Sequence, residues 1–176
     1  MSSFARSASA GALALVGVVV GLPTMVGAAQ EKAVDPPKGA RLVLEAAADG
    51  VQIYACEAKE GGFAWVFKSP EAALFDRYGR QIGTHFAGPT WKTADGTAIV
   101  GELAAHADAP VKTAIPWLLL RAKSHEGSGP LANVAFIRRF ETKGGIAPRS
   151  ACDAAHVSEQ ARMRYSAIYQ FFAAPN

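Results

Sequence analysis

Alternation of apolar and polar side chains at every second residue is the feature that most constrains the fold of this chain. It is clear in Val51–Cys56 and again in Phe63–Phe67. Strict alternation of this kind is typical of a half-buried β-strand. Between the two runs, Lys59–Gly62 are all polar or glycine, so the sequence predicts a β-hairpin here.

Further extended segments follow along the chain. A turn between Asp76 and Gly79 leads into an extended run from Ile82 to Phe86. Asp95-Gly96 then separates two more extended runs, and Asp-Gly in this setting is a strong local signal for a hairpin. Two later apolar segments are also predicted to be strands, Pro116–Ala122 and Leu131–Thr142.

The C-terminal segment from Arg162 to Phe172 fits two structures. At period two, one face carries Met163, Tyr165, Ala167, Tyr169 and Phe171. At the helical period, Tyr165, Ile168, Tyr169 and Phe172 would share a face instead. The aromatic content favours a strand. Only Ala154–Arg162, with Asp153 as a possible N-cap, is a fair helix candidate.

Composition agrees with an all-β fold. The chain has 17 glycines and 10 prolines in 176 residues, which favours many turns over long helices. Half of its residues are hydrophobic and 19% are charged, so it can build a core. We therefore predict one mostly antiparallel β domain over residues 41–174, a sandwich or a barrel with long loops and at most one or two short helices.

The N-terminus has the pattern of a secretory signal peptide. Arg6 is the only charge before Glu31, and the apolar run Ala10–Leu22 has about 13 residues, fewer than the roughly 20 needed to span a bilayer. Small residues around Ala28 suit a cleavage site. We predict a signal peptide over residues 1–28, an exposed lead-in over 29–40, and a periplasmic or secreted protein without a stable membrane span after cleavage. The alternative is an uncleaved membrane anchor.

The two cysteines, Cys56 and Cys152, are an even number in a chain predicted to enter an oxidising compartment. We expect them to form a structural disulfide. The alternative, a reactive thiol pair, lacks both a CxxC spacing and flanking basic residues.

Common catalytic and cofactor-binding motifs are missing from the sequence. It contains no HExxH, GxSxG or P-loop motif, and its four histidines are widely scattered. The net charge is +3, and no run of Lys or Arg exceeds two residues, so nothing favours nucleic-acid binding. We expect no cofactor and no metal.

The densest group of chemically capable residues runs from Gly83 to Trp91. His85 lies on an extended stretch, and Gly88-Pro89 bends the chain before Trp91. A histidine beside a tryptophan can bind a polar ligand, transfer a proton or ligate a metal. We take His85 and Trp91 as ligand-binding candidates. The alternative is a core histidine that is hydrogen-bonded to the backbone.

Arg138 is the third candidate for ligand binding. On its strand it shares a face with Val134, Phe136 and Phe140, so we expect it to point inward among apolar side chains. A guanidinium in such a place can bind a carboxylate or another anion. The alternative is an ion pair with an acidic residue of another strand.

A series of short motifs runs along the chain. In order, they are Gln52-x-Tyr54-x-Cys56, Trp65-x-Phe67-x-x-Pro70-x-Ala72-x-Leu74, Asp76-x-x-Gly79, Gly83-x-His85-Phe86-x-Gly88-Pro89-Thr90-Trp91, Asp95-Gly96, Pro116-Trp117-Leu118, Thr142-x-Gly144-Gly145-x-Ala147-Pro148, Cys152 and Tyr165-x-Ala167-x-Tyr169-x-Phe171. Together they resemble a family of exported bacterial and fungal proteins known as domain of unknown function thirty-four fifty-five. The resemblance covers about Leu42 to Phe172 and implies a single exported domain with paired cysteines, without an established activity. The malate dehydrogenase label of some fungal members finds no support here, because the chain has no Rossmann unit.

These observations leave three hypotheses for function. The first is a non-catalytic exported β domain that binds a small molecule or a partner in the envelope or outside the cell. The second is a metal-assisted hydrolase or an oxidoreductase that uses His85. The third is a structural or stress-related envelope protein.

Overall fold

The computed structural model describes residues 31–149 and 151–175. The predicted signal peptide, residues 1–28, lies outside them. Within the described residues the chain forms eight strands and, at Glu31, one helical turn. The strands are β1 (Arg41–Lys59), β2 (Gly62–Phe75), β3 (Gln81–Phe86), β4 (Thr90–Thr93), β5 (Ala98–Ala107), β6 (Trp117–Glu126), β7 (Val134–Gly144) and β8 (Gln160–Ala173).

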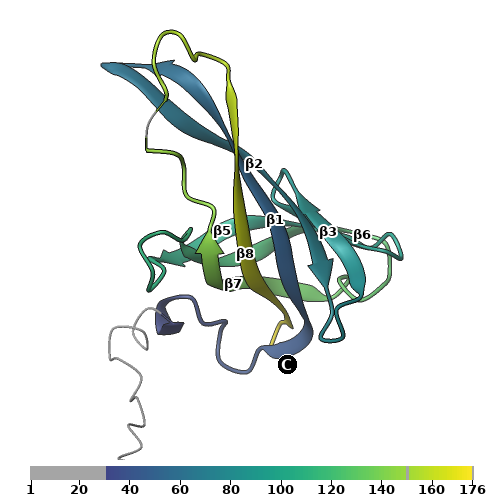
Figure 1. The fold of residues 1–176 in the computed structure, drawn as a ribbon. Coiled ribbons are helices and arrows are strands. Elements are labelled where there is room, and N and C mark those ends of the chain that lie inside the picture. The colour runs from purple at the N-terminus through teal and green to yellow at the C-terminus, as the bar shows by residue number, and fades with distance from the viewer. Residues whose placement is uncertain (1–30, 150, 176) are drawn as a thin grey trace, which may run out of the picture.

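The eight strands form a closed antiparallel barrel, so the all-β prediction is confirmed, and of the two predicted architectures the barrel is the one present (Figure 1). Each strand pairs with the next one along the chain, and β1 also pairs with β8 to close the ring. The predicted hairpins around 59–62 and Asp95-Gly96 are present as β1–β2 and β4–β5. Among the described residues, no helix is long and apolar enough to cross a membrane.

The C-terminal segment is a strand, as its aromatic content indicated. Tyr165, Ala167, Tyr169 and Phe171 are all buried, while the residues between them are only partly buried. These four side chains belong to the main core, together with residues from most of the other strands. The period-two face of this segment therefore forms one wall of the barrel interior.

The helix predicted over 154–162 is wrong. Residues 153–158 form bends and turns, and β8 begins at Gln160. The carboxylate of Asp153 accepts a hydrogen bond from the Ala155 backbone N–H at 2.9 Å. This is the contact of an Asx-turn, in which an aspartate binds the backbone two residues ahead. An aspartate favours such turns as strongly as it favours helix N-caps, so the sequence signal was ambiguous.

Glycine 50 allows the first two strands to approach closely. A Cβ at this position would lie 2.1 Å from the Glu71 carbonyl oxygen and 2.5 Å from the Ala72 Cα. No side chain fits in that space. The close approach of β1 and β2 at this point therefore requires a residue without a side chain.

A second apolar cluster lies outside the barrel wall. It contains Trp117 and Leu119 of β6, with Phe136 and Phe140 of β7 packed against it. The lead-in covers it, because Val34 is fully buried in this cluster although most of its neighbours are exposed. Strands β6 and β7 are therefore buried on both faces.

Strands β1, β2 and β8 extend well beyond the remaining strands (Figure 1). At this extension the predicted disulfide between Cys56 and Cys152 is present, with a Cα–Cα distance of 5.4 Å. Cys56 is fully buried, and its backbone also pairs with Glu159 and Ser158. The bond thus attaches the long β7–β8 connection to β1. A disulfide fits an oxidising extracellular compartment.

Candidate functional site

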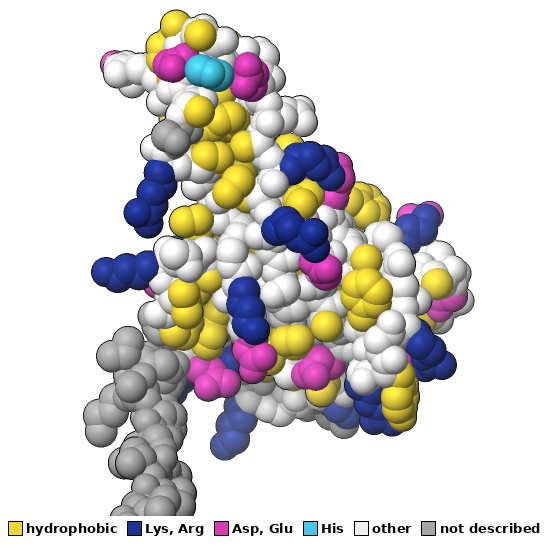
Figure 2. All heavy atoms as spheres, in the orientation of Figure 1, with side chains coloured by type: hydrophobic (Ala, Val, Ile, Leu, Met, Phe, Trp, Pro, Cys, Tyr) yellow, Lys and Arg dark blue, Asp and Glu magenta, His cyan; other side chains and the backbone are white. Residues whose placement is uncertain are grey.

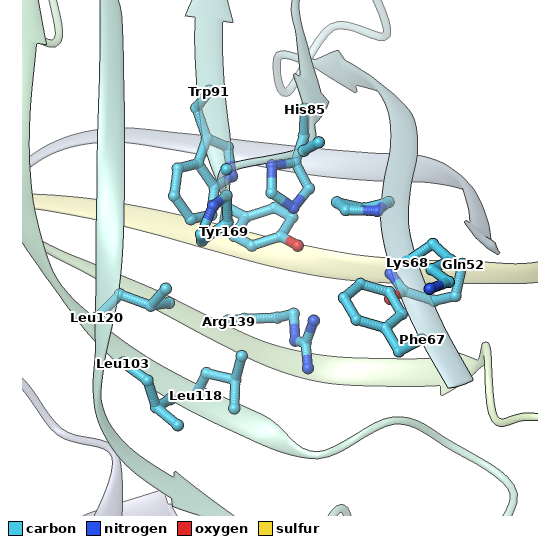
Figure 3. A pocket seen from close by; sticks show the side chains of 14 residues that line it. Gln52, Phe67, Lys68, His85, Trp91, Leu103, Leu118, Leu120, Arg139 and Tyr169 are labelled. Carbon is cyan, nitrogen blue, oxygen red and sulfur yellow. The ribbon is translucent and has the colours of Figure 1, made fainter. Parts of the chain in front are cut away.

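A cavity of about 440 Å³ opens at one end of the barrel (Figure 3). Its deep part is lined by buried side chains: His85, Trp91, Leu120 and Tyr169. Its mouth is apolar and more exposed, because Phe67 is 49% and Leu103 is 60% accessible to solvent. Pockets of this size hold small organic molecules in many proteins.

His85 and Trp91 are directly opposite each other on β3 and β4, so both side chains enter the cavity from one wall. Their rings stack with centroids 4.4 Å apart and planes 9° from parallel. Tyr169 of β8 packs edge-on against both, at 5.1 Å and 5.4 Å. Gly101 on β5 makes room for the indole, because a Cβ there would lie 3.0 Å from a Trp91 ring carbon.

His85 is a neutral side chain with a defined tautomer. Its Nδ1 lies 2.8 Å from the Thr90 carbonyl oxygen, and a carbonyl only accepts, so Nδ1 carries the proton. Burial, with a smaller contribution from the charge of Arg139, lowers the pKa of His85 to about 3. Nε2 therefore has a free lone pair and accepts a hydrogen bond from any donor that reaches it. Figure 3 shows this imidazole in the same cavity as Arg139.

The arginine that faces the cavity is Arg139, which the sequence analysis did not select. Its guanidinium enters the cavity from β7, and only 9% of the residue is exposed. Nε and Nη2 both donate to the Pro116 carbonyl oxygen, at 3.1 Å and 2.8 Å. Among the described residues, no carboxylate forms an ion pair with it. A buried charge without a counter-charge is expensive, which makes Arg139 unusual.

Arg138 does not point into the barrel, so that expectation is corrected. It is 7% exposed, but on the outer face of β7, where its guanidinium lies 4.5 Å from the Phe140 ring centre. Its Nη2 forms ion pairs with Glu31 at 3.3 Å and Asp35 at 3.4 Å, both in the lead-in. Apolar neighbours do surround Arg138, as expected. They belong to the outer cluster, because β7 is covered on both sides.

Three residues on the cavity wall have buried polar atoms without a hydrogen-bond partner among the described residues. They are the Gln52 Nε2, the Trp91 Nε1 and the Tyr169 hydroxyl. The Tyr165 hydroxyl lies near Gln52 and Tyr169, but outside hydrogen-bond geometry, and burial raises its pKa. Native structures satisfy about nine in ten buried polar groups or more, so such a group of exceptions calls for an explanation.

The structure therefore brings together two of the three candidates, His85 and Trp91, and separates them from Arg138. The residues that the sequence analysis missed are Arg139, Gln52 and Tyr169. Tyr169 was detectable as a member of the period-two face of β8. Arg139 gave no signal, because its sequence neighbours on the same face include an alanine and a glutamate.

No three His, Cys, Asp or Glu side chains lie close enough to hold a metal ion within residues 31–149 and 151–175. On the face of the molecule shown in Figure 2, Lys and Arg side chains are interspersed with Asp and Glu. That face has no stripe of a single charge of the kind that binds nucleic acid.

The chain was compared with known proteins and families. The model of a family described as "Protein of unknown function (DUF3455)" matches residues 36–173, which include all eight strands. No curated protein and no solved structure matches.

Proposed function

This chain belongs to the DUF3455 family, and we propose that it is an exported protein, periplasmic or secreted, that binds a small molecule inside its barrel without chemical change. The disulfide between Cys56 and Cys152 supports export, since such bonds persist in oxidising compartments. The predicted signal peptide over residues 1–28 supports it as well. Barrels of about eight strands are wide enough to hold one small ligand.

The observation that carries the proposal is the set of unpaired polar atoms on the wall of an apolar cavity. The Trp91 Nε1 is a buried donor without a partner among the described residues, and the Gln52 amide and the Tyr169 hydroxyl, which lie near the Tyr165 hydroxyl, make no hydrogen bond of standard geometry there. Leu103 and Leu118 supply apolar wall beside them. Ordered water needs two to four polar partners per molecule, so a largely apolar wall with few polar groups suits an organic ligand better.

Binding in the cavity is tested with N-phenyl-1-naphthylamine, a neutral dye that fluoresces in apolar surroundings. We expect saturable binding with one site per chain. Leu103→Trp places a large ring at the cavity mouth and should weaken binding about tenfold or more. The same substitution at Leu42, which is 47% exposed and lies outside this cavity, is the matched control and should bind like the wild type.

Two results would refute the proposal. One is the absence of any ligand: the dye shows no saturable binding, and native mass spectrometry of protein isolated from its native compartment shows no copurifying small molecule. The other is equal dye affinity in Leu103→Trp and Leu42→Trp.

A further inference from the structure

We propose that the cavity binds an organic monoanion, whose single negative group pairs with Arg139 and whose apolar body fills the space toward Leu103 and Phe67. This inference rests on the proposed function and adds the chemical class of the ligand. It is based on the charges around the cavity and on the contrast between the buried Arg139 and the apolar side chains near the mouth.

The first step is the sign of the charge. The cavity wall includes two cationic residues, Lys68 and Arg139, and no aspartate or glutamate. Arg139 is the deep one, and the Pro116 carbonyl oxygen accepts from only two of its three nitrogens. A guanidinium binds carboxylate and sulfonate groups through paired N–H donors, and charge-assisted bonds of this kind are the strong ones. An anionic group is therefore the part of a ligand that best compensates the buried guanidinium of Arg139 for its lost hydration.

The second step is the number of charges. Lys68, at the mouth, already has a counter-charge, because its Nζ forms an ion pair with Glu57. Glu57 also pairs with Lys59, and these two lysines lower the pKa of its carboxyl to about 2, so it stays ionised. His85 adds no positive charge, because burial keeps it neutral. Among the buried side chains of the cavity wall, Arg139 therefore carries the one positive charge without a counter-charge, and it matches a ligand with a single negative group.

The third step is the rest of the ligand. Leu103, Leu118 and Leu120 also line the cavity, with Leu118 beside Arg139 in the β6–β7 pairing, and Phe67 borders the mouth (Figure 3). An inorganic anion would leave this apolar surface without contact. An aromatic or aliphatic body of moderate size covers it and gains about 25 cal/mol for each Å² that leaves water. Inorganic phosphate or chloride is therefore a poor ligand by comparison.

A pair of dyes tests the charge directly. 8-Anilino-1-naphthalenesulfonate has the scaffold of N-phenyl-1-naphthylamine with one added sulfonate. If Arg139 binds the anionic group, the sulfonate dye should bind about tenfold tighter or more than the neutral dye. Arg139→Gln should bring the ratio of the two affinities close to one. Neutral-dye binding by that variant also shows that its barrel is folded.

The neighbouring arginine provides a matched control. Arg138→Gln removes the same charge one residue away, on the outer face of β7, and should keep the ratio of the wild type. Arg139→Lys keeps the charge but loses the two-pronged donor, so its ratio should fall between wild type and Arg139→Gln. Decanoate and 1-naphthoate serve as competitors that distinguish a chain-like body from a ring-like one.

The outcomes separate the two proposals. Equal affinities for the two dyes, or a ratio that Arg138→Gln lowers as much as Arg139→Gln does, would overturn the anion and leave cavity binding intact. Failure of both dyes to bind would refute the proposed function itself. Displacement of the sulfonate dye by either carboxylate at micromolar concentration supports the anion, and displacement by neither at millimolar concentration overturns it.

Discussion

Replacement of His85 by phenylalanine should change how the stability of the protein depends on pH. His85 has an ordinary pKa of 6.5 in the unfolded chain and a pKa of about 3 in the barrel. Between these values the unfolded state takes up a proton that the folded state does not. Stability that is fully present above pH 6.5 is therefore lost as the pH falls toward 3.

The magnitude follows from the two pKa values. Each pH unit well below 6.5 costs about 1.4 kcal/mol, and between pH 7 and pH 5 the loss from this one group is about 2 kcal/mol. The carboxyl groups with lowered pKa values, such as Glu57 and Asp76, act at lower pH, below their ordinary values of 4.5 and 3.8. The window from pH 7 to pH 5 therefore isolates the buried histidine from these carboxylates.

Urea unfolding followed by tryptophan fluorescence measures the effect, with the disulfide kept intact. Phenylalanine preserves a flat ring against Trp91 and cannot titrate, so the variant should lose about 2 kcal/mol less than the wild type between pH 7 and pH 5. The variant should also be less stable than the wild type at pH 7, because it loses the hydrogen bond to Thr90. The test therefore compares the change between pH 7 and pH 5, not the stability at one pH.

An exposed histidine provides the control. His156 pairs with Asp153, which raises the pKa of His156, so its contribution grows as the pH falls and has the opposite sign. His156→Asn should make the acid loss slightly steeper. An unchanged pH dependence in His85→Phe would show that His85 takes up protons in the folded barrel, and the argument from burial would fail.

Two further predictions concern the parts that surround the barrel. Cys56→Ala/Cys152→Ala removes a disulfide between residues that are 96 apart in sequence. By the loss of chain entropy, the double substitution should lower the free energy of unfolding by about 4–5 kcal/mol. Urea unfolding against the oxidised wild type measures this loss, and a loss below about 1 kcal/mol would contradict the prediction. Val34→Ala should cost roughly 2 kcal/mol because this side chain is fully buried in the outer cluster, whereas Val111→Ala, at a position that is 57% exposed, should be close to neutral in the same assay. Equal effects of the two valine substitutions would mean that the lead-in does not pack on the barrel in solution.

Sequence patterns predicted correctly those parts of the fold where a local pattern is compatible with only one local structure. The alternation in β8 indicated correctly that Tyr165, Tyr169 and Phe171 share a buried face. Asp95-Gly96 predicted the β4–β5 turn, where the Asp95 carboxylate accepts a hydrogen bond from the Thr97 backbone N–H. Local residues determine local hairpins, so these predictions needed no knowledge of the rest of the chain.

The assignment of faces on β7 could not be derived in the same way. Apolar neighbours identify a buried face, but β7 has two, and the lead-in creates the second one through Val34. Arg138 and Arg139 are adjacent in sequence and lie on opposite sides of the barrel wall. Which of them faces the cavity depends on the position of the whole strand in the ring, and no local pattern carries that information.

The pairing of β1 with β8 has a consequence for how the protein is made. Arg41 lies beside Ala173 in that pairing, so the first strand has no partner on this edge until β8 has been made. Contacts this distant in sequence form slowly. Until then β1 presents an open hydrogen-bonding edge, which invites association with other chains. Closure of the ring is therefore the stage at which a chaperone would have the greatest effect on yield.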